Sequence, residues 1–219
     1  MGFWGWLRDR YLVITFVSGL ILIAMGVLIL TELALPPGAG AQTAAQAMAF
    51  LRQMGMIVIM TGTQAPAGIA GRLAGAGTTA VRSLIAMGVA PEAIADAMAE
   101  AGLPSPRLGD PVPGVPPLNL PAREIVARWM SALANEGVRQ LAAGLARSTG
   151  DIDLVAVHGL GVPRHLGGPM HWADAKGPLI LRRDLTKWAA DAAVWAPHPG
   201  WDAFVSLGKV RAGAVVEPA

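Results

Sequence analysis

The 219-residue sequence contains no cysteine and carries few charges. Without cysteine the chain can form no disulfide bond, no thiolate zinc site and no cysteine nucleophile. The cysteine content therefore does not indicate whether the protein works in an oxidising or a reducing compartment. Charged residues make up 15% of the chain, against roughly 25% in an average soluble domain. The net charge of +2 and the lack of a basic cluster interleaved with aromatic residues argue against a nucleic-acid-binding protein. What remains is an alanine-rich, apolar chain in which 53% of residues are hydrophobic.

The N-terminal segment contains an uncharged run from Tyr11 to Leu30. About twenty apolar residues are needed for a helix to cross a bilayer, where backbone polar groups must be satisfied internally. Trp4 and Trp6 lie just before the run, where aromatic anchors of a membrane interface are found. We therefore expect residues 1–35 to hold one transmembrane helix, with membrane association through residues 11–30. A buried core helix is the alternative.

The flanks of this run leave two orientations open. Arg8 and Arg10 precede it, and positive charge on that side places the N-terminus in the cytoplasm and the rest of the chain outside. Alternatively, Ala39–Gln42 has the small-x-small form of a signal-peptidase site, within a Pro/Gly linker at residues 36–43.

Two helical regions separated by a proline-rich linker follow. Residues 44–104 predict a short helix, an extended piece and two further helices, the last beginning at Pro91 and ending at Gly102. Residues 105–121 contain too many prolines for a helix and form the linker. Residues 122–210 place apolar side chains on one face of a long first helix and continue as helices with glycine-rich corners. No strand–helix alternation is evident, so we expect an all-α fold without a parallel sheet.

A glycine-rich corner, "HGLGVPRHLGGPMHWAD" at residues 158–174, holds three of the four histidines. These histidines are seven and six residues apart, which is wider than the usual spacing of zinc ligands, so surface histidines are expected rather than a metal site. The glycines lack the G-x-G-x-x-G order and follow no predicted strand, which argues against a phosphate loop.

Two interpretations of the same corner remain. Asp151 and His158, with Asp153 nearby, share a helix face and could form an acid/base pair, unless both aspartates only cap their helix. The simpler interpretation is structural: glycines and prolines reverse the chain and Trp172 packs the corner.

Residues 127–174 resemble the C-terminal helical domain of 3-hydroxyacyl-CoA dehydrogenases, as found in the multifunctional enzymes of fatty-acid β-oxidation. The resemblance rests on an ordered series of motifs: Asn135-Glu136-Gly137, Asp151-Ile152-Asp153, the glycines and proline Gly159, Gly161 and Pro163, the turn Gly167-Gly168-Pro169, and Trp172. A weaker resemblance upstream makes residues 44–104 a degenerate first helical repeat, and residues 122–210 the domain itself.

The departures from this family pattern limit the expected chemistry. The resemblance implies a catalytic histidine and glutamate in an NAD-binding Rossmann domain, and this sequence shows no such domain. It also implies an asparagine where this sequence has Gly71, in Gly71-Arg72-Leu73. We therefore expect a truncated or diverged member that binds no cofactor and does not catalyse hydride transfer alone.

The resemblance further implies a two-repeat helical bundle of the 6-phosphogluconate dehydrogenase C-terminal-like type. Its role would be to complete an acyl-CoA cleft and to hold a homodimer or a Rossmann-domain partner, with NAD and acyl-CoA as the family's ligands. Asn135, Glu136 and His158 are the candidate catalytic residues. The family's chemistry is cytoplasmic, which conflicts with an exported domain. A non-catalytic, membrane-tethered interaction module is the alternative function, and a fusion of an unrelated membrane helix to a dehydrogenase tail is a third explanation.

Overall fold

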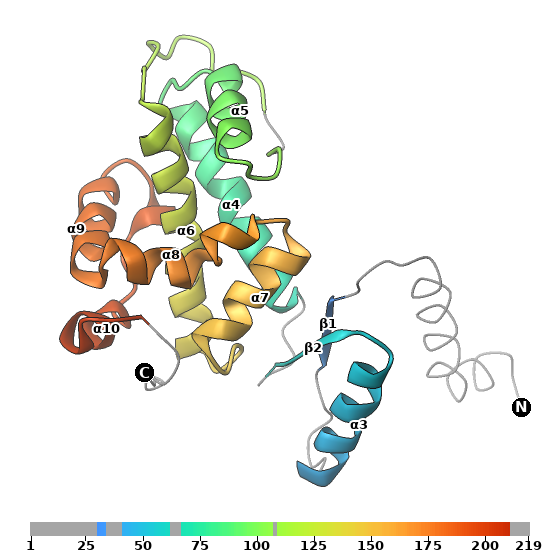
Figure 1. The fold of residues 1–219 in the computed structure, drawn as a ribbon. Coiled ribbons are helices and arrows are strands. Elements are labelled where there is room, and N and C mark those ends of the chain that lie inside the picture. Colours follow the sequence, from blue (N-terminus) through green and yellow to red (C-terminus); the bar gives the residue numbers. More distant parts are fainter. Residues whose placement is uncertain (1–29, 34–40, 62–66, 107–108, 211–219) are drawn as a thin grey trace, which may run out of the picture. The chain divides into compact units, whose positions relative to one another are not determined.

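The computed structural model describes residues 30–33, 41–61, 67–106 and 109–210. The chain divides into two compact units, residues 1–60 and residues 61–219 (Figure 1). The division after Met60 falls inside the range 44–104 that the sequence assigns to a first helical repeat.

The first unit contains a strand–helix–strand arrangement. Strand β1 (Leu30–Leu33) is followed by helix α3 (Ala41–Gln53) and strand β2 (Ile57–Met60). The strands pair in parallel, with Leu30 opposite Ile57, and a helix is the usual connection between parallel strands. The expectation of no parallel sheet is therefore wrong for these residues. Four-residue strands are too short to show a period, and the run "IVIM" of β2 is apolar throughout, so neither strand gives an alternating pattern.

The predicted membrane span at residues 11–30 lies outside the described residues except at its end. There Leu30 begins β1, so the helix expected within residues 1–35 does not extend through residues 30–33. In the part of the chain that the structure describes, no helix is both long enough and apolar enough to cross a bilayer.

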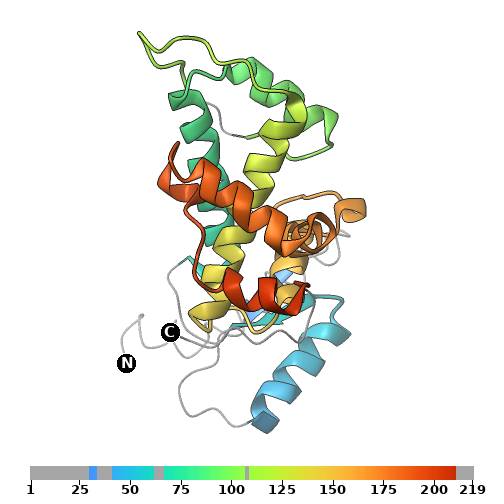
Figure 2. The ribbon, with the colours of Figure 1, turned by 90° about the vertical axis from the view of Figure 1, so that its left-hand side faces the viewer.

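The second unit is helical, as the sequence predicts. It consists of α4 (Gly68–Ala86), α5 (Pro91–Glu100), α6 (Ala122–Ala142), α7 (Thr149–Gly159), α8 (Pro169–Lys176), α9 (Pro178–Trp188) and α10 (Trp201–Leu207), with 3-10 turns η1 (Arg164–Leu166) and η2 (Ala193–Trp195). Helices α4 and α6 lie side by side (Figures 1 and 2). Helix α5 packs on α6 and α7 packs on α4, so each helix of the pair α4–α5 contacts a helix of the pair α6–α7.

Helix α6 is the central element of this unit, because α4, α5, α8 and η2 all pack against it. Its predicted apolar face is buried, and so are polar residues on its other sides, namely Arg128, Ser131, Asn135, Glu136 and Gln140. Buried polar groups are costly unless they are hydrogen-bonded. The partners of these side chains therefore decide what α6 can contribute to function.

Arg128 shows how α6 organises the C-terminal helices. Its guanidinium lies 2.7 Å from Asp191 and 3.1 Å from Glu124. It also lies over the rings of Trp188 and Trp195, 4.9 Å and 5.1 Å from their centroids. Cation–π and ionic contacts to the same buried guanidinium thus attach the segment from α9 to η2 onto α6.

Candidate functional site

The glycine-rich corner is built around the carboxylate of Asp153. This residue lies in α7, and its two oxygens accept hydrogen bonds from the first backbone N–H groups of α8. Oδ1 accepts from Met170 N at 2.7 Å, and Oδ2 accepts from His171 N at 3.0 Å. N–H groups in the first helical turn have no partner within their own helix, and the positive end of the helix dipole favours an anion there. Asp153 therefore caps α8 rather than its own helix.

Two glycines permit this close approach. Gly168 has φ +100°, and a Cβ at this position would lie 2.5 Å from Asp153 Oδ1 and 2.7 Å from Asp153 Cα. Gly167 has φ +71°, and its Cβ would overlap the His171 ring. Both backbone conformations and both contacts exclude an ordinary side chain. The D-I-D and G-G-P motifs thus belong to one structural feature, the junction of α7 and α8.

Burial raises the pKa of Asp153 to about 7, against the opposing effect of the hydrogen bonds from Met170 and His171. A carboxyl group that titrates near neutrality is a candidate for acid/base chemistry. Here, however, both carboxylate oxygens already accept hydrogen bonds from the N-terminus of α8, so a structural role accounts for the position of Asp153.

Asn135, a candidate catalytic residue, is fully buried and uses its whole amide. Nδ2 donates to the carbonyls of Val194 and Ala196, at 3.2 Å and 2.8 Å. Oδ1 accepts from His198 N and Trp201 Nε1, both at 3.0 Å. A side-chain amide has two donor hydrogens and two acceptor lone pairs, so none is left for a substrate. The structure gives Asn135 the geometry of a hub that fixes the C-terminal segment to α6.

Glu136, the second candidate, is held by positive side chains. Its Oε1 accepts from Arg72 Nε at 2.7 Å and from Gln140 Nε2 at 3.4 Å. Its Oε2 lies 3.6 Å from Arg139. Because Arg72 belongs to α4, this carboxylate joins α4 to α6.

His158, the third candidate, lies at the C-terminal end of α7 and is partly exposed. It lines a small cavity of about 180 Å³ together with Asp153, Arg164 and Gly167. No hydrogen bond joins it to Asp151 among the described residues. The backbone N–H of Asp151 instead donates to Ser148 Oγ at 3.1 Å, so Ser148 is the N-cap of α7. His158 is thus the candidate whose side chain faces a cavity.

Further observations concern the side chains of the glycine-rich corner. Among the residues that the structure describes, no three His, Asp or Glu side chains converge as metal ligands. Trp172 is only partly buried, with Lys176 Nζ 5.1 Å from its ring centroid. Met170 is the fully buried side chain here, and it packs against α6, where a Cβ on Gly137 would lie 2.7 Å from its Sδ. Met170 fills the place that the sequence assigned to Trp172, and nothing in the sequence pattern marks it.

The corner does not fit the pyrophosphate of a dinucleotide. It follows a helix, α7, and continues into η1, whereas a dinucleotide loop follows a strand and opens a helix whose N-terminus holds the phosphates. At α8 the N-terminal N–H groups are already bound by Asp153.

Comparison with known proteins finds relatives that match part of this chain. No protein-family model matches the chain. Peroxisomal bifunctional enzyme from Danio rerio is 44% identical over 64 residues, or 29% of this chain and 9% of that protein. The Homo sapiens peroxisomal bifunctional enzyme is 41% identical over 70 residues, which is 32% of this chain and 10% of that enzyme. The predicted resemblance to multifunctional β-oxidation enzymes is confirmed over about 30% of the chain.

A plant relative extends the same similarity. The glyoxysomal fatty acid beta-oxidation multifunctional protein MFP-a from Cucumis sativus is 37% identical over 70 residues, or 32% of this chain and 10% of that protein. The chain therefore matches about a tenth of the length of these curated relatives. This is consistent with a partial C-terminal domain of the 3-hydroxyacyl-CoA dehydrogenase type.

Proposed function

We propose that the helical unit is a C-terminal domain of the 3-hydroxyacyl-CoA dehydrogenase type, which contributes to an acyl-CoA cleft and to dimerisation and does not catalyse hydride transfer by itself. The observation that carries this proposal is the set of contacts that the Asn135 and Glu136 side chains make. Both lie in the motif that resembles the family, and both have their polar atoms bound within the protein.

The reaction of the related enzymes gives the reason. Oxidation of a 3-hydroxyacyl-CoA to a 3-oxoacyl-CoA needs a base that takes the hydroxyl proton and an NAD that accepts the hydride. A general base must reach the reacting proton with a free lone pair. The four hydrogen bonds of Asn135 and the two arginines around Glu136 argue against both residues in that role. On this proposal NAD is bound by another domain or subunit, and the glycine-rich corner does not hold it.

A reductase assay tests this proposal. The 219-residue chain is mixed with acetoacetyl-CoA and NADH, and loss of NADH absorbance is followed. We expect no turnover, together with measurable binding of acetoacetyl-CoA by calorimetry. Turnover by the chain alone would contradict the proposal, and its loss in a His158→Ala variant would then identify the base. Absence of both turnover and acyl-CoA binding would contradict the cleft role.

The second candidate function is a membrane-tethered interaction module without catalysis. The uncharged run Tyr11–Leu30, which lies outside the described residues except for Leu30, is the observation that favours it. Alkaline carbonate extraction of membranes tests the tether. Retention of the protein in the membrane fraction is expected for a spanning helix, and its release would eliminate this candidate.

A further inference from the structure

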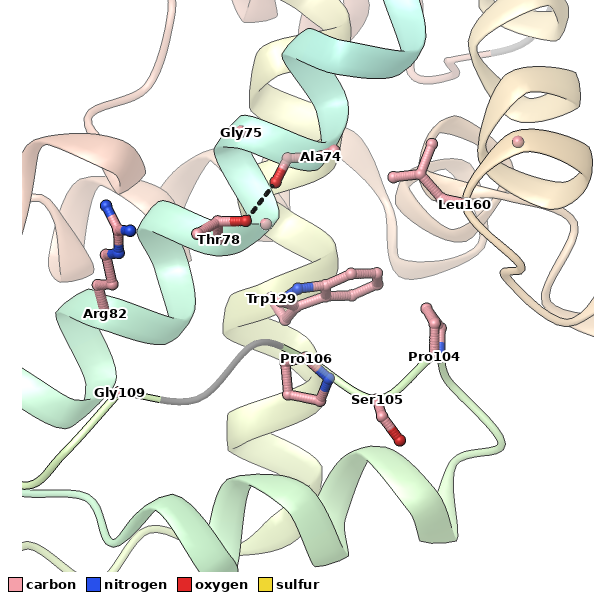
Figure 3. Close-up of a pocket in the computed structure, with 12 residues that line it drawn as sticks. Ala74, Gly75, Thr78, Arg82, Pro104, Ser105, Pro106, Gly109, Trp129 and Leu160 are labelled. Carbon is pink, nitrogen blue, oxygen red and sulfur yellow. Dashed lines mark hydrogen bonds between the residues drawn. The ribbon is translucent and has the colours of Figure 1, made fainter.

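A groove of about 650 Å³ opens in the helical unit, between α4, the end of α7 and the segment that follows α5 (Figure 3). Trp129, from α6, lies across the groove, with Thr78 of α4 on one side and Pro106 on the other (Figure 3). Arg82 and Leu160 lie toward its two ends in the same view. Its volume is within the range of about 300–1,000 Å³ that is typical of small-molecule sites.

Two glycines of α4 shape the groove in different ways. A Cβ on Gly77 would lie 2.9 Å from Trp129 Nε1, so the absence of a side chain there lets the indole approach α4. A Cβ on Gly75 would meet nothing within 4 Å, so this position leaves open space above the helix backbone. The groove therefore has room beside a buried aromatic ring, and prolines and glycines form much of its wall.

The indole brings an unused donor to this space. Trp129 is only 5% exposed, and its Nε1 donates to no residue in the described part of the chain. Among the described residues, Trp129 Nε1 is not one of the fully buried polar atoms that lack a partner, so it keeps contact with solvent and a ligand in the groove can reach it. By contrast, Trp195 Nε1 donates to Arg128 O at 2.9 Å and Trp201 Nε1 donates to Asn135.

The charge of the groove is also one-sided. Arg82 is the charged residue among those that line it, and its side chain is exposed. Helix α4 contains no acidic residue, and no carboxylate within the described ranges forms an ion pair with Arg82. The other arginine of α4, Arg72, is paired with Glu136. A planar guanidinium in such surroundings suits a carboxylate or phosphate.

We propose that this groove binds a small amphipathic anion. Its apolar body packs against Trp129 and Pro106, an acceptor on it takes the Trp129 N–H, and its carboxylate or phosphate meets Arg82. The site goes beyond the proposed function and does not rest on it, because none of the residues that define it is a candidate for dehydrogenase chemistry. An aromatic acid and an alkyl acid share this chemistry, and the experiment distinguishes them.

The full chain labelled with ¹⁵N is titrated with indole-3-acetate and, separately, with octanoate, and the indole N–H resonances are followed by NMR. We expect one indole signal to shift, and the Trp129→Phe variant identifies it by its disappearance. The probe with the lower dissociation constant shows whether the groove prefers an aromatic acid or an alkyl acid. Indole-3-acetamide, which lacks the charge, and the Arg82→Gln variant should each bind about tenfold more weakly. Arg123→Gln, an exposed change on α6 outside the groove, should bind normally.

A Gly75→Leu variant separates binding from folding. Leucine favours a helix interior more than glycine and meets open space here, so the melting temperature should be kept or raised while the probe no longer binds. The proposal is overturned if no indole signal shifts at millimolar probe, or if Gly75→Leu or the neutral amide leaves the affinity unchanged. Failure of the acyl-CoA assay alone would leave these results unaffected.

Discussion

Arg72 Nε lies 2.7 Å from Glu136 Oε1, and this ion pair joins α4 to α6. The glutamate side chain is 11% exposed and the arginine side chain 37%. Glu136 belongs to Asn135-Glu136-Gly137, which carries the family resemblance, and Arg72 belongs to Gly71-Arg72-Leu73, where the sequence departs from the family pattern. The two motifs are 64 residues apart along the chain and meet in the structure. Their contact argues for a structural role in packing the two long helices α4 and α6 together.

We expect Glu136→Gln to lower the free energy of unfolding by about 1–2 kcal/mol, because charge-assisted hydrogen bonds from Arg72 and the attraction of Arg139 are lost. A double-mutant cycle with Arg72→Gln, measured by denaturant unfolding, should give a coupling of about 1 kcal/mol. Glu100→Gln, an exposed change at the end of α5, is the control and should leave stability nearly unchanged. An unchanged stability in Glu136→Gln would return this residue to the list of catalytic candidates.

Replacement of Asn135 by alanine should be more costly. The change leaves two backbone carbonyls, one backbone N–H and the Trp201 indole without their partner, so we expect a loss of about 3–5 kcal/mol. Hydrogen exchange should speed up first around η2 and α10, which Asn135 holds to α6. Asn119, the only other asparagine, is exposed in the linker, and Asn119→Ala should have little effect. Equal effects of the two substitutions would contradict the hub role.

The contact between Gly168 and Asp153 predicts a steric cost beyond backbone strain. Gly168→Ala should lower the free energy of unfolding by about 2–4 kcal/mol, because its Cβ would overlap Asp153 in addition to occupying an unfavourable φ. Gly144 also has positive φ, but a Cβ there meets nothing within 4 Å, so Gly144→Ala should cost only about 1–2 kcal/mol. Thermal unfolding of both variants measures the difference, and equal losses would refute the overlap.

Asp153 should make stability depend on pH in an unusual direction for an aspartate. Its pKa is raised from 3.8 to about 7 on folding, so the folded protein binds the proton more tightly than the unfolded chain. Its contribution is fully present below about pH 4 and is lost as pH rises to about 7, by on the order of a few kcal/mol. The free energy of unfolding measured with urea should therefore contain a component that falls as pH rises across this range, and this component should be absent in Asp153→Asn.

His198 contributes with the opposite sign and provides the internal comparison. Burial, followed by the positive charge of Arg139, lowers the pKa of His198, so its contribution is lost as pH falls through its folded pKa. The Asp153→Asn variant keeps His198. Its free energy of unfolding should therefore rise with pH over the range in which that of the original protein falls or stays flat. Identical profiles for the two proteins would show that Asp153 does not titrate in this range.

Local patterns predicted much of the helical unit. The proline at the start of α5 and the glycine after its end appear in the structure where the sequence places them. The apolar face predicted for the first helix after the linker, α6, is likewise buried. The parallel pair β1–β2 was missed because a four-residue strand pairs with a distant segment, and no local period records that pairing.

The candidate site was predicted as a set of residues but not as an arrangement. The order of the N-E-G, D-I-D and G-G-P motifs identified the family resemblance, and the comparisons confirmed it over about 30% of the chain. The uses of these side chains depend on contacts between helices. Asp153 meets the N-terminus of α8, and Asn135 meets a segment about sixty residues further along.

The sequence by itself determined that the second unit is helical and where α5 begins and ends, because prolines, glycines and apolar periodicity act within a few residues. It also determined the likeness to β-oxidation enzymes. Only the tertiary structure decided that Asn135 and Glu136 bind within the protein, that Met170 fills the corner, and that Trp129 and Arg82 line the same groove. A buried polar side chain takes its role from the partners that folding brings to it, and those partners lie far away in the sequence.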